Sequence, residues 1–232
     1  KQHKVPFMIG TNEWDASLFT VDSPKVASYV KTMKQDPETI ASLYKDFPFQ
    51  CDPALAAQII ADGWMTGAVK LLADSANKAA PAFAYFYSFL TPRIEENYIG
   101  PPHMFELPYV FGTLDMVNPV AVEVPAADPC TSTSKAVSDL KEQNEWSRYF
   151  FTTADAADQA DRSIAQQMAK SWTSFAKTGD PNYDGKNIWP RYNVDDDVMR
   201  QFSSDDEGII TKVNKARVDY QLSFIREFYG VR

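Results

Sequence analysis

The sequence predicts a mixed α/β fold whose central sheet is only partly contained in the chain. Two apolar runs have the length and composition of buried strands: Val5–Ile9, which stops at Gly10, and Ala82–Phe89, which lies between Pro81 and Pro92. Apolar residues at helical spacing lie between these runs and recur nearer the C-terminus. Because α/β domains bury both faces of a sheet that normally has more strands, we expect most of the sheet to lie outside this chain.

The other elements are predicted from periodicity and from residues that start or stop helices. Pro53 suits the first turn of a long helix, and Gly179-Asp180-Pro181 is a strong helix terminator. The stretch Asp115–Ser138, rich in proline, serine and threonine, has the least regular pattern. We expect helices at about Pro37–Tyr44, Pro53–Asn77, Ala156–Lys177 and Lys215–Phe228, and short strands near Val198–Ser203 and Gly208–Lys212.

Composition favours a folded, acidic protein. Hydrophobic residues make up 44% of the chain and aromatic residues 13%, which is enough for a substantial core. The formal net charge of −8 disfavours nucleic acid as a partner, since phosphates require a basic face, and it equally disfavours docking to anionic lipid. No apolar run reaches the length of a membrane span, so no membrane segment is predicted.

Cys51 and Cys130 are the only cysteines. They could form one disulfide or remain two thiols in a reducing compartment, and the sequence leaves both interpretations open, together with a secreted or a cytoplasmic location. With two cysteines and two histidines, a structural zinc site is not expected, and no other metal or cofactor is predicted.

The N-terminus leads directly from the polar stretch Lys1–Lys4 into the predicted strand Val5–Ile9, with neither an initiator Met nor a signal peptide. A chain that opens on a buried strand usually opens in the middle of a fold. We therefore expect a fragment of a longer protein or one half of a cleaved protein.

The histidines are the first candidates for chemistry, because imidazole exchanges protons near neutral pH. His3 lies in the polar N-terminal stretch and is expected on the surface. His103 follows a predicted strand, and Pro101 and Pro102 stiffen the backbone before it. On these local grounds a structural hydrogen-bonding role for His103 is the more common interpretation, and a catalytic role is the alternative.

Two acids, Glu13 and Asp15, follow the first predicted strand, at the end where α/β folds place their functional groups. Either carboxylate could instead cap a helix that starts near Ser17. The local pattern favours capping or surface exposure over catalysis.

Four segments resemble those of a known protein family, and this resemblance favours the catalytic interpretation over the structural one. Gly10–Asp15 resembles the G-x-N-x-x-[DE] loop of the type-B carboxylesterase and cholinesterase family, and Tyr98–Gly112 resembles its G-x-x-H-x-x-E-[LI]-x-[YF]-V-F-G segment. Trp172–Asn182 is similar to the W-x-x-F-A-x-T-G-x-P-N signature of that family, and Ile188–Tyr192 to its W-P-x-Y motif. Each motif alone is moderately specific, but four in the right order across most of the chain are strongly specific.

The resemblance implies an α/β-hydrolase fold and roles for individual residues. In this family the triad runs serine, acid, histidine along the chain, so Asp15 would be the triad acid and His103 the catalytic base. Glu106 would support the histidine loop, and Leu18 and Phe19 would line the acyl pocket, although plain core packing is an equal alternative for both. Glu13 lies two residues too early for the pattern and is expected to be a surface acid.

The nucleophile is missing from this set. The family's G-x-S-x-G elbow is absent, and the only glycine pair at that spacing, Gly63–Gly67, has Met65 at the central position in a helical context. The serine and the oxyanion hole are expected upstream, in an N-terminal part that would be the partner of this chain. The segments around Gly67 and Gln221, which cholinesterases often bridge, contain no cysteine at those positions.

The sequence thus predicts that residues 1–232 are the C-terminal part of an α/β-hydrolase catalytic domain, not an autonomous domain. The whole enzyme would hydrolyse small-molecule carboxylic esters through an acyl-serine, without a cofactor, and the isolated chain would be inactive and expose strand edges. The alternatives are a cholinesterase-like adhesion domain without catalysis and, less favoured, a small self-standing binding domain. The presence of both Asp15 and His103 favours the enzyme.

Overall fold

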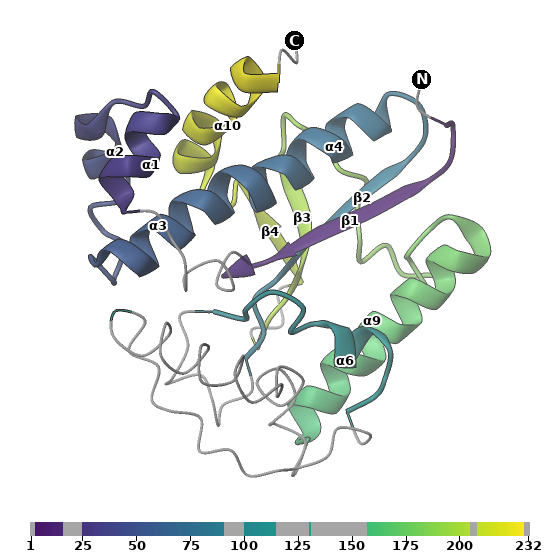
Figure 1. Cartoon of the computed structure of the whole chain (residues 1–232). Helices are drawn as coiled ribbons and strands as arrows, with labels where there is room; N and C mark the ends of the chain where they lie inside the picture. Colours follow the sequence, from purple (N-terminus) through teal and green to yellow (C-terminus); the bar gives the residue numbers. More distant parts are fainter. Residues whose placement is uncertain are drawn as a thin grey trace.

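The computed structural model describes residues 3–15, 25–90, 100–114, 130, 157–204 and 208–229 (Figure 1). Leu18 and Phe19, the two candidates for an acyl pocket, lie outside the described residues. The described part contains both strands and helices, with helices between the parallel strands, which confirms the predicted mixed α/β class.

Four strands form one sheet in the order β1 (Phe7–Asn12), β2 (Ala82–Tyr87), β3 (Val198–Phe202) and β4 (Ile209–Thr211). The first three run parallel, and β4 is antiparallel to β3. Each strand coincides with a predicted one, so the two short C-terminal segments extend the same sheet. Within the described residues β1 pairs with β2 alone and is therefore an edge of the sheet.

The first strand differs from its predicted range. It starts at Phe7 and runs beyond Gly10, and its last two residues, Thr11 and Asn12, remain paired with the end of β2. Both side chains are polar yet buried. A hydropathy pattern ends at the first glycine or polar residue, and for that reason the sequence predicts an earlier stop. The extension brings two polar side chains to the carboxyl end of the sheet.

Helices cover both faces of this sheet (Figure 1). Side chains alternate along β2: Phe83 belongs to a core cluster with residues of α9 (Gln159–Thr178), whereas Phe86 belongs to a second cluster with residues of α4 (Ala68–Asn77). This alternation is the expected result of a strand that is buried on both faces. The other helices are α1 (Val26–Thr32), α2 (Pro37–Leu43), α3 (Asp52–Ile60), α6 (Leu107–Val110) and α10 (Lys215–Tyr229).

The long helix predicted over Pro53–Asn77 is interrupted by a π-helical segment, η2 (Ala61–Gly67), between α3 and α4. A Cβ built on Gly63 would lie 3.0 Å from Cδ1 of Ile225, and one on Gly67 would lie 3.0 Å from Cδ2 of Leu222. The two glycines therefore let α10 approach the helix closely. Their helical setting confirms that this glycine pair is not a nucleophile elbow.

The ends of α9 follow clear capping signals. Asp158 accepts a hydrogen bond from the backbone N–H of Asp161, whose carboxylate accepts one from the backbone N–H of Asp158 in return. At the other end Gly179 adopts φ = 76°, a left-handed conformation that glycine enters without a steric penalty. The predicted stop at Gly179 is confirmed, and the helix begins at Gln159 rather than at Ala156.

A disulfide joins Cys51, just before α3, to Cys130, 79 positions later. This settles the pairing that composition leaves open. None of the described helices is both long and apolar enough to cross a lipid bilayer.

Candidate active site

The candidate acid lies on a short loop at the carboxyl end of β1. The hydroxyl of Thr11 donates to Oδ2 of Asp15 at 2.7 Å, and the backbone N–H of Asn12 donates to the same oxygen at 3.1 Å. Asp15 is 8% exposed. These two donors fix the orientation of the carboxylate and leave Oδ1 for another partner.

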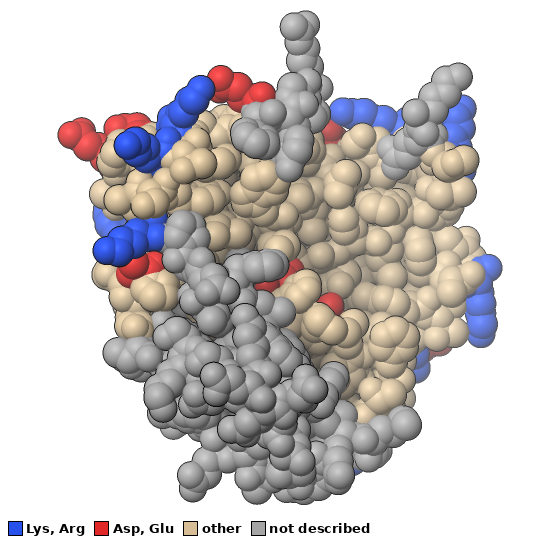
Figure 2. Space-filling view, in the orientation of Figure 1, with Lys and Arg blue, Asp and Glu red and all other residues tan. Residues whose placement is uncertain are grey.

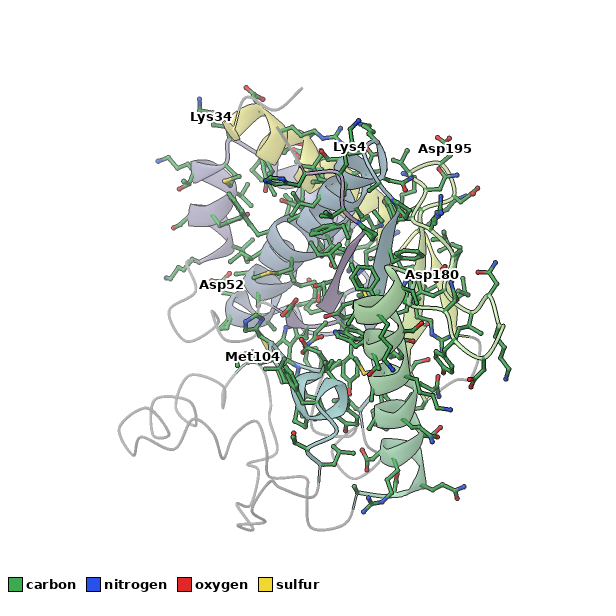
Figure 3. All side chains as sticks on the ribbon, turned by 90° about the vertical axis from the view of Figure 1, so that its right-hand side faces the viewer. Lys4, Lys34, Asp52, Met104, Asp180 and Asp195 are labelled. Carbon is green, nitrogen blue, oxygen red and sulfur yellow. A yellow bond between two sulfur atoms is a disulfide. The ribbon has the colours of Figure 1, made fainter. Side chains whose placement is uncertain are left out.

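The candidate base lies on the loop that leads into α6, where Figure 3 labels the next residue, Met104. The two loops run side by side: the backbone N–H of Trp14 donates to the carbonyl of Pro101 at 3.2 Å, and Trp14 and Pro102 form an isolated β-bridge. Trp14 itself is buried. This pairing brings together two segments that are far apart in the sequence. On the second loop, Met104, the residue after His103, adopts φ = 69°, which is unusual for a residue other than glycine.

The two predicted site residues are in contact. Nδ1 of His103 lies 2.6 Å from Oδ1 of Asp15, and the imidazole side chain is 40% exposed. Among the described residues no group forms a hydrogen bond to Nε2. The ring is therefore held at one nitrogen and open at the other, which is the arrangement of a general base oriented by an acid.

Glu106 is tied to the acid loop rather than to the imidazole. The side-chain amide of Asn12 donates to Oε2 of Glu106 at 2.6 Å and to the carbonyl of Pro102 at 2.7 Å. Asn12 thus links the residue before His103 and the residue three positions after it. The Asn12 amide therefore crosslinks the two loops, and Glu106 accepts one of the two hydrogen bonds that this amide donates.

The electrostatics of the site favour a charged imidazole. The hydrogen bond that His103 donates to Asp15 raises the pKa of His103, and although burial acts in the opposite direction, the net change is upward. Burial also raises the pKa of Glu106, while the hydrogen bond from Asn12 lowers it in part. Within the described ranges, no group of three or more His, Cys, Asp or Glu side chains is placed to hold a metal ion.

Glu13 corrects one expectation. The sequence predicts a surface acid, but the side chain is only partly exposed, and burial raises its pKa to about 7. Its carboxyl group lies against Gly100: a Cβ built there would be 2.9 Å from Cγ of Glu13 and 3.0 Å from Oε2. Glu13 thus contacts a residue 87 positions away, which a local pattern does not show.

Thr11 and Asn12 are site residues that sequence reasoning did not single out. Both lie inside the Gly10–Asp15 motif, and Asn at its third position is one of its fixed residues. That fixed Asn was the available signal. The role of Thr11 carries no such signal, because the second position of the motif accepts any residue.

A model of the carboxylesterase family matches residues 52–221, which is most of the chain. The chain belongs to the carboxylesterase family. The matched range contains His103 and Glu106 and starts after Asp15. The chain resembles phenmedipham hydrolase of Pseudarthrobacter oxydans, with 23% identity over 164 residues that cover 71% of this chain and 27% of that protein. It also resembles fumonisin B1 esterase of Sphingopyxis macrogoltabida, with 23% identity, covering 84% of this chain and 32% of that one.

Solved carboxylesterases share the fold. A thermophilic PNB esterase superposes with a TM-score of 0.63 at 18% identity, covering 93% of this chain and 38% of the other. A carboxylesterase of Geobacillus stearothermophilus superposes with a TM-score of 0.58 at 19% identity, covering 91% and 40%. The chain thus corresponds to an α/β-hydrolase portion and spans about a third of the length of the two curated relatives named above.

Proposed function

We propose that this chain supplies the acid and the base of an enzyme that hydrolyses carboxylic esters with a Ser-His-Asp triad. The observation that carries the proposal is the 2.6 Å contact between Nδ1 of His103 and Oδ1 of Asp15. Membership of the carboxylesterase family supplies the reaction class. Under this proposal residues 1–232 are the C-terminal part of the catalytic domain and not an autonomous domain.

His103 would act through Nε2, which faces away from Asp15. It takes the proton of the attacking serine, and the alkoxide adds to the ester carbonyl. The imidazolium then gives that proton to the leaving alcohol, and water repeats the sequence on the acyl-serine. Asp15 holds Nδ1 in its protonated form and stabilises the imidazolium, in keeping with the raised pKa of His103.

The serine and the oxyanion hole would come from an N-terminal part that carries the G-x-S-x-G elbow. Three observations support this division. The chain spans well under half of its relatives. The strand β1 is an edge, and Phe7, Met8 and Ile9 on it are only half-buried. On the face shown in Figure 2, most Lys and Arg side chains lie at the margin, and uncharged residues fill much of the middle.

Three surface hollows of the described chain lie away from the acid–base pair. They are lined by residues of α9, of the turns beside it, and of the α1–α3 region, and none of the three includes Asp15 or His103. The walls that bind the acyl and alcohol groups would therefore come from other segments. Leu18 and Phe19 remain proposed contributors to the acyl pocket.

The test is hydrolysis of a p-nitrophenyl ester by the protein that joins this chain to the serine-bearing segment. We expect activity from the joined protein and none from residues 1–232 alone. Asp15→Asn should slow turnover by roughly 10³-fold or more, because it misorients the imidazole. An unaffected rate would remove Asp15 from the mechanism and make Glu13 the next candidate. A joined protein with no ester hydrolysis would favour the adhesion domain.

A further inference from the structure

Glu13 occupies a specific place between the two loops of the site. Its backbone N–H donates to the carbonyl of Tyr87 at 2.9 Å, so the main chain is anchored to the end of β2. Its side chain fills the space where a Cβ of Gly100 would be. Gly100 is buried and does not need its glycine for a left-handed φ, since its φ is not in that region. The glycine therefore serves the close approach of Glu13.

This contact continues a series along the two loops. Asp15 contacts His103, Trp14 pairs with Pro101 and Pro102, and Glu13 packs on Gly100. The contact between Glu13 and Gly100 is thus the one farthest from the imidazole in this series of contacts between the two loops. Since two prolines stiffen the segment between Gly100 and His103, we expect a shift at Gly100 to reach the ring.

The carboxyl group of Glu13 has no hydrogen-bond partner among the described residues. The titratable groups of the two loops and of the adjoining strand β2 are Asp15, His103, Glu106, Tyr85 and Tyr87, and none of them is among the causes of the raised pKa of Glu13. Burial is the only cause of its raised pKa, so none of these groups compensates its charge. The neutral form fits this place, and the ionised form is left there without a partner.

We propose, as a deepening of the esterase function above, that Glu13 is a positioning residue for His103: its protonated side chain packs on Gly100 and holds the histidine loop against the acid loop, and ionisation loosens this contact. Glu13 does not touch the reacting atoms. It makes the geometry of the acid–base pair depend on pH through a second group besides the imidazole.

The experiment uses the joined protein and compares the pH dependence of kcat/KM for p-nitrophenyl acetate in wild type and in Glu13→Gln, which keeps the shape of the neutral acid. The activity of the variant relative to wild type should rise at least threefold between pH 6 and pH 8.5. The matched control is Glu38→Gln, at an exposed position of α2, for which the same ratio should stay flat. A flat ratio for Glu13→Gln would overturn the proposal.

A steric variant tests the contact itself. Gly100→Ala places a methyl group where the Glu13 side chain lies and should displace it. In the Gly100→Ala background, Glu13→Gln should no longer change the pH dependence. If the two substitutions act independently, Glu13 does not work through Gly100 and the proposal fails.

A readout without catalysis separates this proposal from the esterase function. The Cε1 resonance of the His103 ring, assigned by its loss in His103→Ala, should follow one ionisation fewer in Glu13→Gln than in wild type. The same curve in both proteins would overturn the positioning role even if the protein is an esterase. If the protein has no esterase activity but the titration curves of wild type and Glu13→Gln differ in this way, the positioning role of Glu13 stands and the proposed function is wrong.

Discussion

Nδ1 of His103 lies 2.6 Å from Oδ1 of Asp15, although 88 positions separate the two residues. The contact exists because β1 and β2 are parallel neighbours, so their carboxyl ends open at the same edge of the sheet. Thr11 and the backbone of Asn12 then hold the other carboxylate oxygen. The carboxylate of Asp15 is thus held at both oxygens, by Thr11 and Asn12 at Oδ2 and by His103 at Oδ1.

Asn12→Ala should reduce turnover of the joined protein. The substitution removes the two hydrogen bonds that tie the acid loop to the histidine loop, at Pro102 and Glu106. We expect kcat to fall on the order of 10- to 100-fold with little change in KM, because small misplacements of a catalytic group are costly. Asn193→Ala, at an exposed turn before β3, is the control. Equal kcat values for the two variants would show that the crosslink is not needed.

The stability of the joined protein should depend on pH through the Asp15–His103 pair. The pKa of His103 is raised by Asp15, so the pair adds stability that is fully present below the ordinary histidine pKa of 6.5 and is lost as pH rises through the raised value. Asp15→Asn should therefore lower Tm more at pH 5.5 than at pH 9. Asp46→Asn, at a fully solvated acid, should show no such trend. If the loss of Tm in Asp15→Asn grew larger as the pH rises, it would contradict the raised pKa of His103.

The disulfide should contribute strongly to stability. Closing a loop of 79 positions removes conformational entropy from the unfolded chain worth about 4 kcal/mol in the loop-entropy description. Replacing both Cys51 and Cys130 by alanine should lower the urea midpoint, measured by circular dichroism, relative to the oxidised protein. A reducing agent should lower the wild-type midpoint and leave the double variant unchanged. Equal midpoints for the oxidised protein and the double variant would refute this contribution.

Sequence patterns predicted the elements whose signals are local. Ala82 at the start of β2 and Gly179 at the end of α9 follow from proline, aromatic and glycine positions. Helix α1 has no counterpart among the predicted helices. It has seven residues, and its N-cap, Lys25, makes no capping hydrogen bond, so the usual start signal is absent. The π-helical segment was also missed, because apolar spacing does not distinguish it from an α-helix.

The site was predictable where motifs fix residue types and unpredictable where burial depends on distant contacts. The motifs located Asp15 and His103, and the structure brings the two together. Glu13 was mistaken for a surface acid because a local pattern does not show that its side chain packs against Gly100, 87 positions away. The pairing of the two cysteines was likewise open, since spacing alone does not show which thiols meet.

Activity of His103→Ala in the joined protein tests the central claim most directly. Nε2 of the imidazole faces away from Asp15 and is the proposed proton acceptor, so kcat/KM for p-nitrophenyl acetate should fall by roughly 10³-fold or more. His3→Ala, which changes the other histidine of the chain, should retain wild-type activity. A His103→Ala protein with activity within tenfold of wild type would contradict the assignment of Asp15 and His103 as the acid and base of the triad.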